Sequence, residues 1–77
     1  ITSANLDLPR KGRVSARVHD VTGRRVRSLV AAVLPAGHHR IAWDGRDDRG
    51  TSVASGIYYV VVSVEGDRVA RKVTLLK

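Results

Sequence analysis

The feature that most limits the fold of this chain is a turn-rich stretch in its second half. Trp43, the only tryptophan, is followed by Asp-Gly-Arg-Asp-Asp-Arg-Gly at residues 44–50. A Ser-Gly pair at residues 55–56 then leads into Ile-Tyr-Tyr and a run of valines. Asp and Gly favour turns, whereas β-branched and aromatic residues favour strands. The stretch therefore predicts a strand, a long turn and a second strand, as in a small β-sandwich.

Much of the remaining chain alternates apolar and polar residues over short segments, which is typical of antiparallel strands with one solvated face. Strands are expected over residues 1–8, 13–20, 24–34, 38–43, 57–64 and 68–76. Residues 24–34 also fit a helical spacing, so a helix is an alternative there, although the preceding turn and the valines favour a bulged strand. Six or seven short strands at these intervals predict an all-β fold, an antiparallel β-sandwich.

The alternation also predicts which side chains fill the core. The expected core residues are Val14, Val18, Ile41, Trp43, Tyr58, Val60, Val62, Val73 and Leu75. An exposed stacking platform for a sugar or a base is the alternative for Trp43, but its phase with Ile41 favours the core. The expected turn residues are Asp20, Gly23, Asp44, Gly45, Gly50 and Gly56. Asp suits these positions because it bonds backbone amides, and Gly because it adopts a positive φ.

The length of 77 residues allows one domain, which we expect to span residues 1–77. Because the chain begins with Ile1 instead of Met, it is expected to be a processed product or one domain of a longer protein. The absence of cysteine excludes disulfides and thiolate metal sites. The longest apolar run, residues 29–34, is too short to cross a bilayer, so no transmembrane segment is expected.

The net charge of +7 raises the question of an anionic partner. Arg24, Arg25 and Arg27 form a basic patch beside a turn, and a glycan or another anion is one candidate ligand for it. The other arginines are spread along the chain, so we expect no nucleic-acid partner.

Three carboxylates in the turn-rich stretch invite comparison with a calcium loop. An EF-hand loop that began at Asp44 would need an oxygen ligand at position 46, glycine at position 49 and glutamate at position 55. The chain has Arg46, Arg49 and Ser55 there instead. We therefore expect no cofactor, with Asp44, Asp47 and Asp48 capping turn amides and pairing with arginines. An irregular calcium site is the alternative.

No residue set in the chain has the pattern of a catalytic centre. His38 and His39 are adjacent, so they point to opposite faces of a strand and cannot chelate one ion. His19 has no acidic partner at a zinc-like spacing, and no serine lies in a G-x-S-x-G context. The sequence therefore predicts a protein that is not an enzyme.

One apolar strip is expected outside the core. Ile57, Tyr59 and Val61 lie on the opposite face of their strand from Tyr58 and Val60. The strip is expected to be a packing surface for another domain or subunit. The alternative is a second sheet face partly covered by loops.

The motifs of this chain follow a recognisable order. In sequence they are residues 8–9 (LP), 18–24 (VHDVTGR), 26–30 (VRSLV), 36–38 (AGH), 43–47 (WDGRD), 50 (G), 55–58 (SGIY) and 73–77 (VTLLK). The ordered set resembles the Ig-like domain of the flagellar hook-capping protein (FlgD-like) and the related C-terminal sorting domains of type IX secretion substrates. The chain departs from this pattern in lacking an Asn-Pro-rich lead-in and in carrying His19 where an aromatic residue is common.

The resemblance implies an Ig-like antiparallel β-sandwich of about seven short strands, placed as the C-terminal domain of a larger protein. It also implies a non-enzymatic accessory module of an exported bacterial protein, located outside the cell or on its surface. Its first implied role is secretion sorting or surface attachment, with the secretion apparatus as partner. The alternative is a structural assembly module, as in a hook cap or filament, which associates with an adjacent domain or identical subunits through strand edges and the strip of Ile57, Tyr59 and Val61. A glycan- or anion-binding module using Arg24, Arg25 and Arg27 is the third hypothesis.

Overall fold

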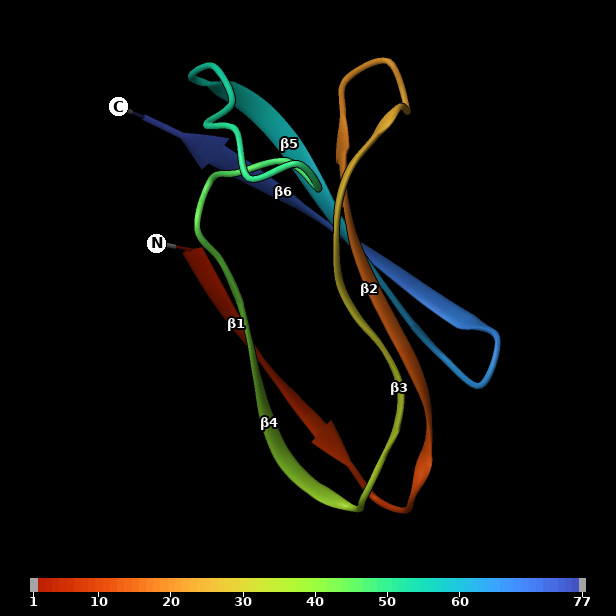
Figure 1. Cartoon of the computed structure of the whole chain (residues 1–77). Coiled ribbons are helices and arrows are strands. Elements are labelled where there is room, and N and C mark those ends of the chain that lie inside the picture. Colours follow the sequence, from red (N-terminus) through yellow and green to blue (C-terminus); the bar gives the residue numbers. More distant parts are fainter. Residues whose placement is uncertain (1, 77) are drawn as a thin grey trace.

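The computed structural model describes residues 2–76, which form strands and no helix (Figure 1). The strands are β1 (Thr2–Leu8), β2 (Gly12–Asp20), β3 (Arg25–Leu34), β4 (Gly37–Trp43), β5 (Gly56–Val64) and β6 (Asp67–Leu75). The all-β class is confirmed, with six strands in the described part of the chain. The helical alternative for residues 24–34 is wrong, because β3 pairs with β2 from Arg25 to Leu34.

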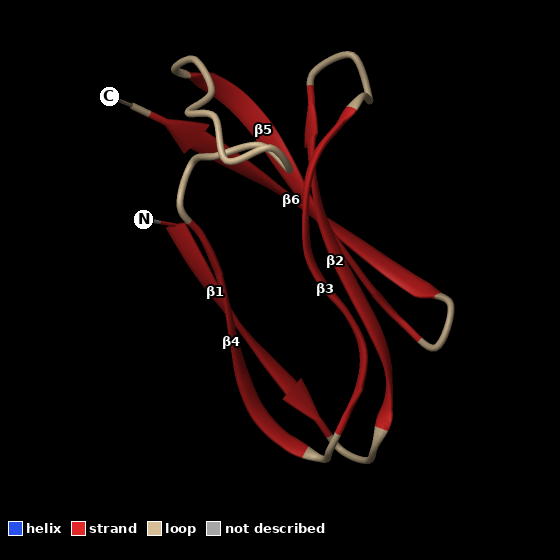
Figure 2. Ribbon diagram, in the orientation of Figure 1, coloured by secondary structure: helices blue, strands red, loops and turns tan. Residues whose placement is uncertain are grey.

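The strands form two antiparallel sheets. One has four strands in the order β3-β2-β5-β6, and the other is a ribbon of β1 and β4. Figure 2 shows the ribbon beside the larger sheet, with the β1–β2 and β3–β4 connections crossing between them at one end. The β4–β5 connection returns the chain to the larger sheet at the other end. Within residues 2–76 there is no helix with the length and hydropathy that a membrane span requires.

The core lies between the two sheets and is centred on Trp43. The buried side chains are Leu8, Val14, Ala16, Val18, Ile41, Trp43, Tyr58 and Val60. Trp43 is 2% exposed, and its ring meets that of Tyr58 edge-on, with centroids 5.1 Å apart. Aromatic pairs favour this geometry because the positive edge of one ring meets the negative face of the other. Val62, Val73 and Leu75 are half-buried and pack against this cluster.

The polar atoms of the two core aromatic residues have partners at the rim of the sandwich. Trp43 Nε1 donates a hydrogen bond to the Arg46 carbonyl at 2.9 Å. The Tyr58 hydroxyl donates to the Ala54 carbonyl at 2.7 Å. Both acceptors belong to the β4–β5 connection, so burying the rings also attaches this loop to the core.

The bulge expected in the third strand is present. The β2–β3 register shifts between Ala16 and Arg17 and again between Val18 and His19. A bulge changes the alternation of side chains along a strand. As a result, Val26 and Leu29 of β3 both pack against the core cluster. Their spacing of three residues would place them on opposite faces of a strand without a bulge.

Candidate interaction site

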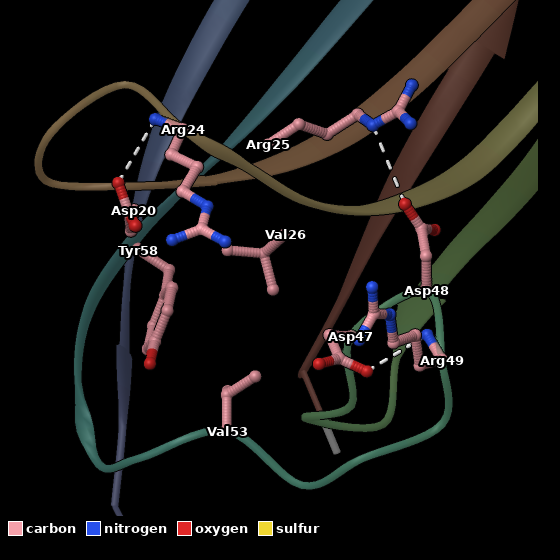
Figure 3. A pocket seen from close by; sticks show the side chains of 9 residues that line it. All are labelled: Asp20, Arg24, Arg25, Val26, Asp47, Asp48, Arg49, Val53 and Tyr58. Atoms are coloured by element: carbon pink, nitrogen blue, oxygen red, sulfur yellow. Dashed lines mark hydrogen bonds and ion pairs between the residues drawn. The ribbon is translucent and has the colours of Figure 1, made fainter.

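A hollow of about 430 Å³ opens at one end of the sandwich, between the β2–β3 turn and the β4–β5 loop. Its charged lining residues come from both segments and are drawn in Figure 3: Asp20, Arg24, Arg25, Asp47, Asp48 and Arg49. The apolar residues are Val26, Val53 and Tyr58. Several residues that the sequence singled out therefore meet here, although they come from separate parts of the chain.

The β2–β3 turn is organised by Asp20. Its Oδ1 accepts hydrogen bonds from the Thr22 hydroxyl at 2.6 Å, the Thr22 amide at 2.9 Å and the Arg24 amide at 3.1 Å. The amide of Gly23, at φ +86°, donates to the Asp20 carbonyl. The hydrogen bond from the Thr22 hydroxyl is the main cause that lowers the pKa of Asp20. Burial opposes it by raising this pKa, and the Arg24 amide, the Thr22 amide and the charge of Arg24 each lower it by less. The ionised carboxylate of Asp20 therefore stabilises the turn.

The β4–β5 loop is organised in the same way by Asp47. Its Oδ1 accepts hydrogen bonds from the amides of Arg49 and Thr51, each at 2.9 Å. The Asp47 amide in turn donates to the Thr51 carbonyl at 2.9 Å. Asp44 Oδ1 accepts from the Arg46 amide at 3.1 Å. These are side-chain-to-backbone bonds of the kind that define Asx turns.

The neighbouring carboxylate of Asp48 joins this loop to β3. Asp48 Oδ1 accepts from the Ser28 amide at 2.9 Å, and the Asp48 amide donates to the Val26 carbonyl at 3.0 Å. Among residues 2–76, no group of three or more acidic, histidine or cysteine side chains is placed to hold a metal ion. The geometry of Asp44, Asp47 and Asp48 thus lends no support to the calcium alternative.

The arginines expected as one basic patch have different surroundings. Arg25 Nε lies 3.5 Å from Asp48 Oδ2. Arg27 Nη1 lies 3.7 Å from Asp44 Oδ1 and donates to the Asp47 carbonyl at 3.1 Å. Arg24 instead extends toward Val26 and Tyr58 in Figure 3. Two of the three guanidinium groups therefore pair with carboxylates of the loop, and the three arginines do not form one uniform patch.

The turn glycines match the expected positions except at one. Gly45 and Gly50 have φ of +77° and +83°, which residues with a Cβ rarely adopt. A Cβ at Gly45 would also lie 3.5 Å from the Leu75 side chain. Gly56 as a turn residue is wrong, because it is the first residue of β5 and has no positive φ. It pairs there with Leu75 of β6.

The three histidines have separate partners and do not converge. His19 Nδ1 donates to the Gly23 carbonyl at 3.1 Å, and His39 Nε2 donates to the Pro35 carbonyl at 2.7 Å. His38 is exposed and bonds to the Asp7 carboxylate. No pair of them is arranged as metal ligands or as a base beside a nucleophile.

The predicted apolar strip lies on the outer face of the four-stranded sheet. Ile57 is 42% exposed and Tyr59 is 36% exposed, whereas Val61 is half-buried. All three belong to β5, on its side away from the core. Because Ile57 and Tyr59 are exposed next to one another, the strip is suited to contact with another surface.

The chain matches known proteins of one kind. The family described as the FlgD Ig-like domain matches residues 2–68. The basal-body rod modification protein FlgD from Salmonella typhimurium and that from Salmonella typhi are each 39% identical over 51 residues. This region is 66% of the present chain and 22% of each relative, so the chain spans about a fifth of their length.

A solved structure supports the same relationship. The structure of FlgD from P. aeruginosa has 28% sequence identity to this chain and a TM-score of 0.65. The similarity covers 95% of this chain and 58% of that one. The likeness therefore includes both sheets of the sandwich.

Proposed function

This chain belongs to the family of FlgD Ig-like domains, and on that premise we propose that it is a non-enzymatic assembly module of a FlgD-type flagellar protein. Its partners are other proteins of the flagellar assembly, and it works outside the cell after export. The observation that carries the proposal is the family match over residues 2–68.

The chemistry of the molecule supports a structural role. The aspartates around the hollow shape turns, and the histidines bond separate carbonyls or a surface carboxylate. The fold presents an exposed apolar strip and unpaired strand edges to other proteins. β3 and β6 are the outer strands of the larger sheet, and β1 and β4 each pair with only one described strand. Unpaired strand edges present rows of amides and carbonyls to which a partner strand can be added.

The other two roles have less support. The relatives described above are named as FlgD proteins, which favours assembly over secretion sorting. The anion-binding hypothesis is weakened because Arg25 and Arg27 are paired with Asp48 and Asp44.

A domain exchange tests the proposal. The part of Salmonella typhimurium FlgD that corresponds to this chain is replaced by residues 1–77, and the chimera is expressed in a strain that lacks FlgD. We expect restored swimming in soft agar and hooks visible by electron microscopy. An unrelated Ig-like sandwich of equal length in the same position is the control and should restore neither. An exported, folded chimera that builds no hooks would contradict the proposal.

A reporter fusion addresses the sorting role separately. The chain is fused to the C-terminus of a periplasmic reporter in a host with type IX secretion. The assembly proposal predicts that the reporter stays in the periplasm. Release into the medium that depends on the fused domain would favour sorting instead.

A further inference from the structure

The outer face of the larger sheet has an apolar row with cations on both sides. Ile57, Tyr59 and Val61 follow one another along β5, which lies between β2 and β6. The register places Arg17 of β2 opposite Val61 and Lys72 of β6 opposite Tyr59. Opposite residues of an antiparallel pair share a face, with Cβ atoms about 5 Å apart. A guanidinium and an ammonium group therefore border the apolar row from its two sides.

A third cation lies further along the same face. Arg68 of β6 is opposite Ser63 of β5, two residues beyond Val61 in the same alternation. We call this surface the basic face and define it by six residues. They are Arg17, Ile57, Tyr59, Val61, Arg68 and Lys72.

One carboxylate borders these charges: Glu65 of the β5–β6 turn lines the same hollow as Arg17, and its Oε1 accepts a hydrogen bond from the Arg13 amide. The acidic residues of β2 and β6 are Asp20 and Asp67, and β5 contains none. Asp20 is paired with Tyr58 and Asp67 with Val64, so both belong to the inward register. The three cations of the basic face therefore outnumber the one carboxylate at its border, and its charge is positive.

The three cations are also free to pair with a partner. Arg17, Arg68 and Lys72 are all exposed. None of them makes an ion pair with another residue of the described part of the chain, where the ion-paired arginines are Arg25, Arg27 and Arg46. The aspartates of the β4–β5 loop bond to the loop, to β3 and to its arginines at one end of the molecule, and they do not pair with these three cations.

The composition of the basic face is that of a protein-binding surface. Tyrosine and arginine are enriched where partners bind most strongly, and an apolar centre with a polar rim is the usual arrangement. Here Tyr59 is at the centre between Ile57 and Val61, and the cations form the rim. Ile57, 42% exposed, and Tyr59, 36% exposed, lie next to one another in this row, so a partner would bury both together.

We propose that the basic face docks an acidic protein surface, one with an apolar ridge between carboxylates, during assembly. The inference rests on the proposed function and adds to it the chemistry of the partner. Opposite charges would speed the encounter and set the orientation, while burial of the apolar row would supply affinity.

Two other occupants fit the basic face less well. A second copy of this chain carries the same net charge of +7, so a twofold contact through this face would bring like charges together. Single-stranded nucleic acid binds to successive aromatic rings along a strand, and Tyr59 is the only aromatic ring among the six residues that define the basic face. Its aliphatic side chains would contribute nothing to a phosphate backbone.

Binding of defined polymers by the isotope-labelled chain tests the chemistry. The probes are a glutamate–tyrosine copolymer, polyglutamate and heparin, followed by amide shifts at physiological salt. We expect the copolymer to bind with the largest shifts on β5 and β6 and to bind about tenfold more tightly than polyglutamate, as the loss of one strong apolar contact implies. Tyr59→Ser and Lys72→Glu should each weaken copolymer binding.

Matched variants off the basic face provide the controls. Val69→Ser changes an apolar residue of β6 that is 57% exposed but paired with Val62, in the inward register. Arg40→Glu reverses an exposed charge on β4, in the other sheet. Both should leave copolymer binding unchanged, and amide spectra with native dispersion should show that every variant is folded. Tighter binding of heparin than of the copolymer, equal losses in all four variants, or no binding would overturn the inference.

The same variants in the chimeric FlgD separate this inference from the proposed function. If the chimera builds hooks and both Tyr59→Ser and Lys72→Glu swim normally, the basic face is not the docking surface although the assembly role stands. If binding maps to the basic face but the chimera builds no hooks, the assembly role fails instead. Loss of swimming in these two variants, with Val69→Ser unaffected, would support both.

Discussion

Tyr58 and Tyr59 are neighbours in sequence with opposite surroundings. Tyr58 is 8% exposed, whereas Tyr59 is 36% exposed on the outer face. Alternation along a strand causes the difference, because successive side chains point to opposite faces. The pair therefore allows a comparison between the Tyr58 hydroxyl, which bonds to the Ala54 carbonyl, and the Tyr59 hydroxyl on the outer face.

Removing the Tyr58 hydroxyl should destabilise the domain. Tyr58→Phe deletes the hydrogen bond to the Ala54 carbonyl and should lower the free energy of unfolding by about 1 kcal/mol. Urea unfolding followed by Trp43 fluorescence measures the change. Tyr59→Phe is the matched control and should change stability by less than about 0.5 kcal/mol, as is usual at exposed sites. Equal losses in the two variants would contradict this account of Tyr58.

Asp20 gives the domain a pH dependence of known sign. Because hydrogen bonds lower its pKa in the folded state, ionised Asp20 stabilises the fold above the unfolded-state pKa. This stabilisation is lost as the pH falls through the folded-state pKa. We expect Thr22→Val to raise the pKa of Asp20, since the Thr22 hydroxyl is the main cause of the shift. Titration of the carboxyl carbon by NMR measures it, and an unchanged pKa in the variant would refute the assignment.

Among the elements, the β4–β5 loop depends most on particular side chains. It has no regular structure apart from a bridge between Arg46 and Ser52. Its shape comes from Asp47 within the loop and from Asp48, which bonds the Ser28 and Val26 backbone of β3. The loop in turn supplies the carbonyls that satisfy the core aromatic residues. Its conformation and core packing are therefore coupled.

Loss of the Asp47 carboxylate should weaken this coupling. Asp47→Ala leaves the amides of Arg49 and Thr51 without their acceptor, which should cost about 1–2 kcal/mol. Asp47→Asn keeps an oxygen acceptor and should cost less. Thermal unfolding of both variants measures the order, which equal losses would contradict. Addition of calcium or EDTA should leave the wild-type unfolding temperature unchanged, whereas stabilisation by calcium would revive the metal alternative.

At the scale of the whole molecule, the two sheets differ in how many strand pairings and buried side chains stabilise them. β2 and β5 are paired on both sides and carry buried residues, among them Val14, Val18 and Val60. β1 is paired only with β4 among the described strands. Local opening costs less where fewer buried contacts and hydrogen bonds are lost.

Hydrogen exchange should reveal this inequality. We expect the hydrogen-bonded amides of β2 and β5 to exchange most slowly, at rates set by global unfolding, and those of β1 to exchange faster. Native-state exchange followed by NMR measures the order residue by residue. Uniform protection of β1 and β2 would mean that the molecule opens only as a single unit, contrary to the prediction.

The sequence by itself determined the local features of this protein. Alternation along strands predicted that Val14, Val18, Ile41 and Trp43 point inward, and all four are buried. These features depend on neighbours within a few residues, so a single sequence contains them. The ordered motifs likewise predicted the family to which the chain belongs.

Only the tertiary structure decided how distant segments combine. It divided the strands into sheets of four and two, and it buried Leu8 and Ala16, which the expected core omitted. It paired Arg25 with Asp48 and placed Lys72 beside Tyr59. Such contacts depend on register and on the approach of segments far apart in sequence, because ion pairing and burial act through space. The periodicity of one strand contains no information about its neighbours.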